Sequence, residues 1–300
     1  MTDAPKQTGR ARTPPPSGAS DARLMLRTMV RSVTDAPASA LFGLTVILFY
    51  VVLGVFAPWI APYGEAEILG RSYEPWAQQF VLGTDQLGRD VLTRLIYGAR
   101  NSVGIALLAT LLSFVIGASL GLAAAIRRGW FDVVFSRLVD LLMSIPSIIF
   151  ALMLLTVFGT SVANLILIIA VLDSTRVFRL ARAVGLGVTV TDFVEAARLR
   201  GEGTRWILLR EVLPNVATPL IAEFALRFCF VFLTISALSF LGVGLQPPMA
   251  DWGSMLRESA TLISYGDPTP LLPAAAIALL TVGVNFVADW LLQKSSGVEA

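Results

Sequence analysis

The chain has 300 residues, of which 55% are hydrophobic and 15% charged, and its formal net charge is +2. Soluble proteins average about 25% charged residues, so this composition excludes a single water-surrounded domain and predicts a membrane protein. The chain contains no histidine and one cysteine, Cys229, which excludes imidazole catalysis, histidine-ligated metals and a disulfide within the chain. The only lysines, Lys6 and Lys294, lie near the two ends and no Gly-x-x-x-x-Gly-Lys-Ser/Thr sequence occurs, so the chain does not bind ATP through a P-loop.

Residues 1–37 are predicted to form a cytoplasmic tail. Three consecutive prolines, 14–16, and low hydrophobicity favour disorder in its first half. Residues 21–34 alternate apolar side chains with arginines, which is typical of a helix lying in the membrane interface. A basic segment that only sets the membrane orientation fits the same pattern. A cleaved signal peptide is disfavoured, because the first apolar run starts late and exceeds the usual length of about 7 to 15 residues.

Long apolar runs predict six transmembrane helices and hence an all-α polytopic membrane protein. About 20 helical residues span the hydrocarbon of a bilayer. The third run contains Pro146 and is expected to kink there. The fourth is too short to span unless residues 173–180 are also helical and partly shielded. The predicted spans cover residues 40–60, 102–126, 133–158, 162–172, 217–241 and 271–292.

The arginines and lysines predict the orientation of these spans. Cytoplasmic loops of membrane proteins retain an excess of both residues. A cytoplasmic N-terminus places most of the 23 cations inside and puts both termini on that side. The loop between spans four and five then also faces the cytoplasm. The cations left outside are Arg71, Arg89, Arg94, Arg100 and Arg257.

Five charged residues fall inside the predicted spans. We expect Arg137 and Asp140, three residues apart, and Glu223 and Arg227, four apart, to form structural ion pairs. Asp289 lies at the inner end of the last span, where it is solvated or paired with a neighbouring helix. Intramembrane charges also keep open an ion-coupled secondary transporter acting without ATPase partners, although no inverted repeat of broken helices supports it.

The charged loop before span five carries a recognisable spacing. A Glu-Ala-Ala sequence is followed after three residues by glycine, and nine residues later comes Glu-Val-Leu-Pro. This resembles the EAA loop of ATP-binding-cassette (ABC) importer permeases, in which isoleucine stands where this chain has Glu211. Two alanines give a helix a face that can seat against another protein, glycine permits a close turn, and Pro214 is expected to block helical continuation into span five. The matched positions are Glu195, Ala196, Ala197, Gly201, Leu213 and Pro214.

Three further segments resemble the dipeptide, oligopeptide and nickel permease family, specifically its C-type subunit. They are residues 82–90 with 97–100, residues 137–140 with 145–147, and residues 238–248 with 251–253. The resemblance covers about residues 40–292, and the Leu-Arg-Asp-x-Leu-Asp-Pro ending of the family is absent after Asp289. The first and last segments are expected to form external loops, with candidate residues Gly83, Asp85, Arg89, Asp90, Pro247, Pro248 and Trp252.

The resemblance implies a type I ABC importer permease fold in a bacterial inner membrane. It implies a heterodimer with a second permease subunit, two ABC ATPase subunits on the cytoplasmic side and an extracytoplasmic solute-binding protein, with no nucleic-acid partner. In such a complex this chain is a non-catalytic subunit, ATP and Mg bind the ATPases, and this chain holds no cofactor or metal. The loop from 195 to about 205 would be the coupling helix.

The implied solute is a peptide, while nickel chelates, opines and other small solutes stay open. The expected organisation is a tail over 1–37, a first span and external loop over 38–101, a permease core over 102–292 with the EAA loop at about 190–215, and a cytoplasmic tail over 293–300.

Overall fold

A computed structural model describes residues 36–296 of the chain, so the predicted interfacial helix at 21–34 lies outside the described residues. The described part is helical, and its one β-type contact is an isolated bridge between Thr84 and Asp90. Two segments are π-helical, η1 and η2, and η3 is a 3-10 helix. In chain order the elements are α2 (Ala38–Ile60), α3 (Val91–Gly98), η1 (Ala99–Val103), α4 (Gly104–Arg127), α5 (Gly129–Met143), α6 (Ser147–Phe158), α7 (Val162–Thr189), α8 (Asp192–Leu199), α9 (Thr204–Trp206), η2 (Ile207–Val212), α10 (Leu213–Phe240), α11 (Trp252–Ser259), η3 (Ala260–Tyr265) and α12 (Leu271–Ser296).

Four helical stretches of the described chain are long and apolar enough to cross a membrane, and a bent pair of helices raises the number to five if it counts as one span. Helix α7 has 28 residues but carries Asp173 and three arginines, so it falls outside this set. The prediction of a polytopic helical protein is therefore confirmed at the level of four or five spans. The four single stretches are Ala38–Ile60, Val91–Arg127, Thr204–Phe240 and Leu271–Lys294.

The predicted third span is two helices instead of one kinked helix. Helix α5 ends at Met143, α6 begins at Ser147, and the axes differ by 89°. Pro146 has no amide hydrogen and disfavours helical geometry in the residue before it, so the chain leaves the helix at this point. The hydroxyl of Ser144 donates to the Leu141 carbonyl at 2.7 Å and satisfies one backbone group at the break.

Two other helices extend beyond their predicted limits. The short apolar run at 162–172 continues as helix to Thr189, and Asp173 within it is only 4% exposed. The condition under which this segment could span, a shielded helical continuation, is therefore met. The second apolar helix begins at Val91 rather than Ser102, because α3 and η1 lead directly into α4.

Helices α4 and α7 form the most closely packed pair. Their backbones approach at Gly117 and Gly121, where an added Cβ would lie 2.5 Å from the Ser174 carbonyl oxygen and 2.6 Å from that of Phe178. Helix association in lipid relies on such close approach of small residues. Large apolar side chains such as Phe49, Val115 and Val157 stay exposed on the outer faces, as expected for surfaces that meet lipid.

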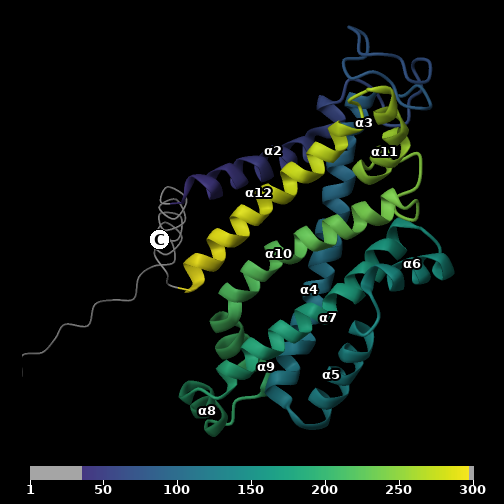
Figure 1. Ribbon diagram of the computed structural model, residues 1–300. Coiled ribbons are helices and arrows are strands. Elements are labelled where there is room, and N and C mark those ends of the chain that lie inside the picture. Colours follow the sequence, from purple (N-terminus) through teal and green to yellow (C-terminus); the bar gives the residue numbers. More distant parts are fainter. Residues whose placement is uncertain (1–35, 297–300) are drawn as a thin grey trace, which may run out of the picture.

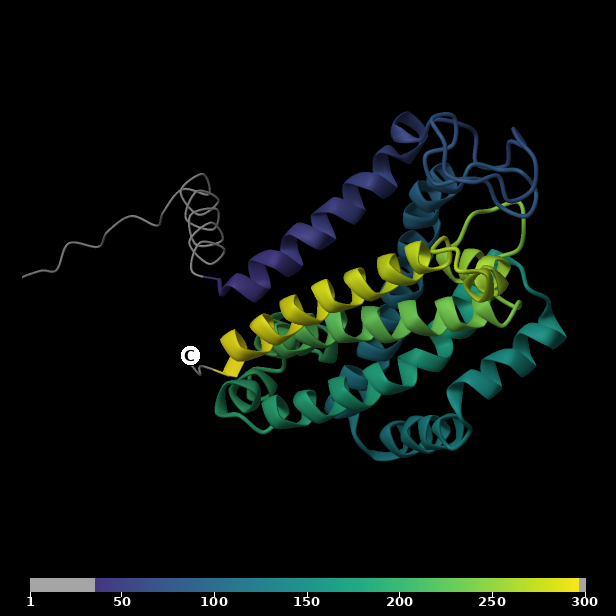
Figure 2. The same ribbon diagram turned by 45° about the horizontal axis from the view of Figure 1, so that its top comes forward.

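The bundle has two distinct ends. Figures 1 and 2 show the start of α2, the end of α12 and the short helix α8 together at one end. The long connection over residues 61–90 and helix α11 lie at the opposite end in both views. Candidate functional residues occur at both ends and between them.

We predict that Gly121→Ala destabilises the protein by about 1–3 kcal/mol, because the new methyl group would meet backbone atoms of α7 that cannot move aside. The measurement is the midpoint of thermal unfolding of the purified protein in detergent. Gly104→Ala is the matched control on the same helix, since nothing lies within 4 Å of an added Cβ there. Equal midpoints for the two variants would contradict the close approach of α4 and α7.

Candidate functional site

The local structure of α8 follows from the residues at its two ends. Asp192 and Glu195 lie in the first turn, where carboxylates interact favourably with the helix dipole. At the other end Gly201 has a φ of 81°, and its N–H donates to the Arg198 carbonyl at 2.9 Å. The N–H of the next residue donates to Ala197, which completes a Schellman motif. The predicted close turn at Gly201 is present.

The faces of α8 differ in exposure. Val194 and Ala197 are fully buried in a cluster with Val212 and Val216 from the following helix. The opposite face, which we call the α8 face, consists of Phe193, Ala196 and Leu199, all exposed, with Leu199 at 83%. Ala196 and Ala197 are successive on a helix and lie about 100° apart, and only Ala196 is exposed, so the two alanines do not form one exposed face. Ala197 anchors α8 to its own chain and Ala196 faces outward, beside exposed Glu195.

Contrary to the prediction, Pro214 does not interrupt the helix. Residues Thr204–Phe240 form one helical stretch, in which the π-helical segment η2 precedes α10 and Pro214 occupies the first turn of α10. A π-turn shifts the hydrogen-bond register, and proline is tolerated in a first turn, so the chain passes without a break. The Asn215 side-chain amide donates to the Glu211 carbonyl at 2.6 Å, and Leu213 is exposed at the start of α10.

Glu211, which stands where the EAA pattern has isoleucine, pairs with an arginine of the same loop. Its carboxylate lies 3.9 Å from the Arg200 guanidinium, which sits 5.8 Å from the ring of Trp206. Arg200 is 54% exposed, so this pair contributes at most about 1 kcal/mol. Its effect is to hold the turn after α8 close to η2.

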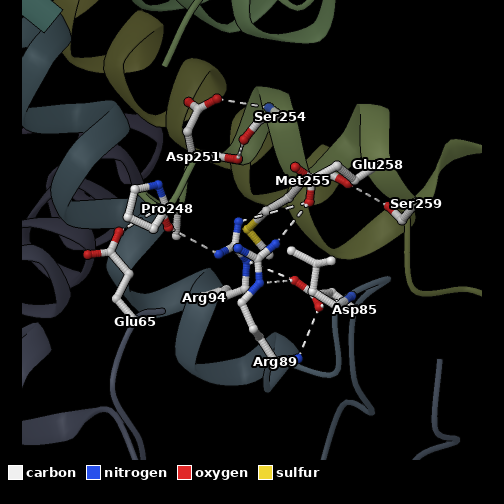
Figure 3. Close-up of polar contacts among 12 residues, drawn as sticks. Glu65, Asp85, Arg89, Arg94, Pro248, Asp251, Ser254, Met255, Glu258 and Ser259 are labelled. Carbon is white, nitrogen blue, oxygen red and sulfur yellow. Dashed lines mark hydrogen bonds and ion pairs between the residues drawn. The ribbon is translucent and has the colours of Figure 1, made fainter. Parts of the chain in front are cut away.

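The opposite end of the bundle holds a network of four charges, the Arg89 network, formed by Asp85, Arg89, Arg94 and Glu258. Arg89 and Arg94 are only 3% and 1% exposed. Asp85 Oδ2 lies 2.6 Å from Arg89 Nε and 3.3 Å from Arg94 Nε, while Glu258 Oε2 lies 3.5 and 4.0 Å from the two guanidinium groups. Figure 3 shows both guanidinium groups together between the two carboxylates. The network joins the 61–90 connection and α3 to α11.

Asp85 is itself fixed by the backbone, since its Oδ1 accepts from the N–H groups of Leu87 and Arg89. Arg94 also donates to the Pro248 carbonyl at 3.4 Å. Pro248 is exposed, as is Pro247, and a cis peptide bond joins them. Gly83, which lies in the 61–90 connection with Asp85, is buried and has a φ of 74°.

Two further aspartates cap helices at this end. Asp90 Oδ2 accepts the Thr93 N–H at 2.7 Å at the start of α3. Asp251 accepts the Ser254 N–H at 2.8 Å and the Ser102 hydroxyl at 2.9 Å, which ties α11 to η1. Burial raises the pKa of the Asp251 carboxyl, and hydrogen bonds from Ser254 and Ser102 oppose that rise. Both aspartates therefore hold the backbone in place.

Trp252, a candidate residue of the predicted external loop, is buried. It is the first residue of α11 and fully inaccessible to solvent. Its Nε1 donates to the Leu95 carbonyl at 2.9 Å and its ring packs edge-on against Tyr50. An added Cβ at Gly98 would lie 2.5 Å from the indole, so a glycine in α3 makes room for this side chain.

Only one of the two expected intramembrane ion pairs forms. Arg227 Nε lies 2.7 Å from Glu223 Oε1, as the spacing predicts. Asp140 instead lies 3.9 Å from Arg179 of α7, because α7 packs beside α5 and brings this arginine closer than Arg137. Asp289 is exposed on α12.

Asp173 and Arg176 form a charged site that sequence reasoning missed. Asp173 Oδ1 lies 3.8 Å from Arg227 Nη1 and 3.7 Å from Arg176 Nη1. The available signal for this site in the sequence was a carboxylate at the end of an apolar run.

The pairing of Arg94 with Glu258 was also missed, since nothing in the sequence links residues so far apart. Among residues 36–296 no group of three potential ligand side chains is placed to hold a metal ion.

Helices of this length and apolarity define an integral membrane protein, and comparison with known proteins specifies its class. Residues 113–295 match the family described as binding-protein-dependent transport system inner membrane component. Residues 38–78 match the N-terminal TM domain of oligopeptide transport permease C. The chain therefore belongs to the binding-protein-dependent transport permeases.

Individual relatives agree with this assignment. A dipeptide transport system permease of Alkalihalophilus pseudofirmus is 34% identical, over 84% of this chain and 83% of the relative. A di/tripeptide transport system permease of Pseudomonas aeruginosa is 36% identical, over 84% of this chain and 86% of the relative. A glutathione transport system permease of Escherichia coli is 33% identical, over 85% of this chain and 84% of the relative.

We predict that Arg94→Ala destabilises the protein by about 3–5 kcal/mol, because the two largely buried carboxylates of the Arg89 network would then share a single arginine. The 61–90 connection should become more sensitive to limited proteolysis of the purified protein. Arg71→Ala is the control, since Arg71 is exposed and lies in the same connection. Similar proteolysis rates for the two variants would show that the network does not hold this connection.

Proposed function

We propose that this chain is the transmembrane permease subunit of an ABC importer that carries peptides or a related small solute into the cytoplasm. The observation that carries the proposal is membership of the binding-protein-dependent transport family. The names of the relatives, which are dipeptide, di/tripeptide and glutathione permeases, support a peptide-like solute.

The proposed topology has six transmembrane helices in a type I importer permease fold. It counts α7 and the α5–α6 pair as one span each, beside the four single stretches. The arginine distribution supports a cytoplasmic location for both termini. Helix α8 lies at the same end of the bundle as the start of α2 and the end of α12, so it would also face the cytoplasm (Figure 1).

We propose that α8 is the coupling helix that docks on an ABC ATPase. An exposed leucine and phenylalanine on a short helix between charged residues are suited to an apolar groove on a partner. Glu195 and Ala196 would contact the partner, and Gly201 would set the turn. Ala197, Leu213 and Pro214 would connect α8 with α10.

Movement of α8 would be transmitted through its buried side. Val194 and Ala197 pack with Val216 and Leu220 of α10 and with Leu122 of α4 in one apolar cluster. Since packed side chains resist compression, a force on α8 would move the helices it contacts. Closure of the ATPases around ATP would then shift the permease from an inward-facing to an outward-facing population.

The remaining partners follow from the same scheme. A second permease subunit would form the other half of the pathway, and an extracytoplasmic solute-binding protein would dock on residues 61–90 and 241–270. ATP and Mg would bind the two ATPase subunits, and this chain would act without catalysis of its own. Residues 38–101 would form the first span and external loop, and residues 102–292 the permease core.

We predict that Leu199→Asp lowers ATP-dependent solute uptake at least tenfold and weakens co-purification of the ATPase subunits. The new charge would have to be desolvated in an apolar groove on the partner. The fold should be intact, because Leu199 is 83% exposed. Uptake into reconstituted vesicles that enclose ATP and the ATPase content of the purified complex are the two measurements.

Ile68→Asp is the control for this variant, since Ile68 is 65% exposed and lies in the connection at the opposite end. It should leave the ATPase content unchanged. Full retention of ATPases and uptake in Leu199→Asp would refute docking through the α8 face.

A further inference from the structure

A cleft of about 280 Å³ lies between α6, α7 and α10 and contains the charged site around Asp173 and Arg176. The three helices contact one another and run close together in Figure 1. Asp173 and Arg227 lie near the middle of α7 and α10, and the exposed Ile148 and Phe230 place the mouth of the cleft at the surface of the bundle. Its lining residues are Ser147, Ile148, Ile169, Leu172, Asp173, Arg176, Arg227, Phe230, Val231 and Thr234.

The charges in this cleft are only loosely paired with one another. Asp173 Oδ1 lies 3.7 Å from Arg176 and 3.8 Å from Arg227, and both distances exceed hydrogen-bond length. Its other oxygen accepts the Ser113 hydroxyl at 3.0 Å, which holds the carboxylate on α4. The two guanidinium groups therefore keep donors available for a further acceptor.

Arg227 is the clearest case of a guanidinium group with an available donor. Its Nε is buried and lies 2.7 Å from Glu223, yet the N–H does not point at the carboxylate and makes no hydrogen bond with any described residue. The guanidinium lies 4.7 Å from the centre of the Phe230 ring, which holds it at the wall of the cleft. The side chain is only 14% exposed.

Two arginines and one carboxylate line the cleft. Arg176 and Arg227 face the cleft together with a single carboxylate, that of Asp173, while Glu223 does not line it. Ionisable groups within a membrane protein usually mark the path of a solute or ion. Guanidinium groups bind carboxylates with paired hydrogen bonds, and low local polarity strengthens such bonds. The rest of the cleft wall is mostly apolar and includes Ile148 and Val231. It could therefore contact the less polar part of the solute, whose chemistry varies between solutes.

We propose that this cleft is a binding site on the solute's path, where Arg176 and Arg227 bind the carboxylate of a peptide-like solute. Asp173, together with Glu223 beside Arg227, positions the two arginines and compensates their charges while the cleft is empty. The inference rests on the proposed permease function and deepens it, since it assigns a chemical group of the solute to named side chains of this subunit. A purely structural ion cluster joining α7 and α10 is the outcome against which it is tested.

The test uses the full importer reconstituted in liposomes with its binding protein and ATP. Uptake of a labelled dipeptide is compared with uptake of its C-terminal amide, each at a concentration that saturates the binding protein. We expect Arg176→Gln and Arg227→Gln to lower uptake of the free acid about tenfold, the worth of a hydrogen bond to a charged group, and to leave amide uptake unchanged. Arg227→Lys should retain the preference for the acid, because it keeps the charge.

Arg179→Gln is the matched control, one turn from Arg176 on α7 but away from the cleft, and should behave as the unmodified complex. Arg176→Gln guards against misfolding, because that side chain is 42% exposed. Equal losses of uptake for acid and amide, or no loss for either, would refute carboxylate binding in the cleft but would leave the proposed importer function intact. Absence of ATP-dependent uptake in the unmodified complex would overturn both.

Discussion

The arrangement of this protein depends on where its few charges can be compensated. Apolar helices that meet lipid offer no water to an ion, so charged side chains must find partners within the protein. They do so at one end of the bundle in the Arg89 network and between the ends around Asp173 and Arg227. Other charged side chains are exposed, among them Arg71, Arg137 and, on α8, Glu195. Each charged cluster therefore marks a place where helices are fixed to one another or where a partner can be received.

Helix α10 connects all three places. Its first turns pack against α8 through Val216 and Leu220, and its middle carries Glu223 and Arg227 beside the cleft. Towards its end Phe232 packs on Trp252, which belongs to the α11 region held by the Arg89 network. A displacement that begins at α8 could reach the cleft through this single helix. Because the chain passes Pro214 as continuous helix, the turns of α10 that pack against α8 and the turns beside the cleft belong to one helical stretch.

The sequence predicted most of the apolar helices but few of the contacts between them. Apolar runs placed α2, α4, α10 and α12 within a few residues, since length and hydrophobicity alone set those elements. The turn at Gly201 was also predictable, because a local motif requires a positive φ.

The sharp bend before α6 was underestimated, because Pro146 shows only that regular helix stops and packing sets the angle. The pairing of Arg94 with Glu258 could not be predicted, since it joins distant segments and one sequence carries no record of that contact. Asp140 was assigned the wrong partner for the same reason: helical spacing identified a local arginine, while packing of α7 supplied a closer one. The different exposure of Ala196 and Ala197 could not be predicted either, because it depends on how α8 packs against its neighbours.

The central claim is that solute movement through this chain is driven by ATP bound to partner subunits. The most direct test is uptake of a labelled dipeptide into liposomes, measured for the purified complex with binding protein and ATP and for the single chain with an ion gradient alone. The account predicts uptake by the complex that stops when ATP is withheld, and none by the single chain. Uptake by the single chain, driven by the ion gradient without ATP, would contradict it.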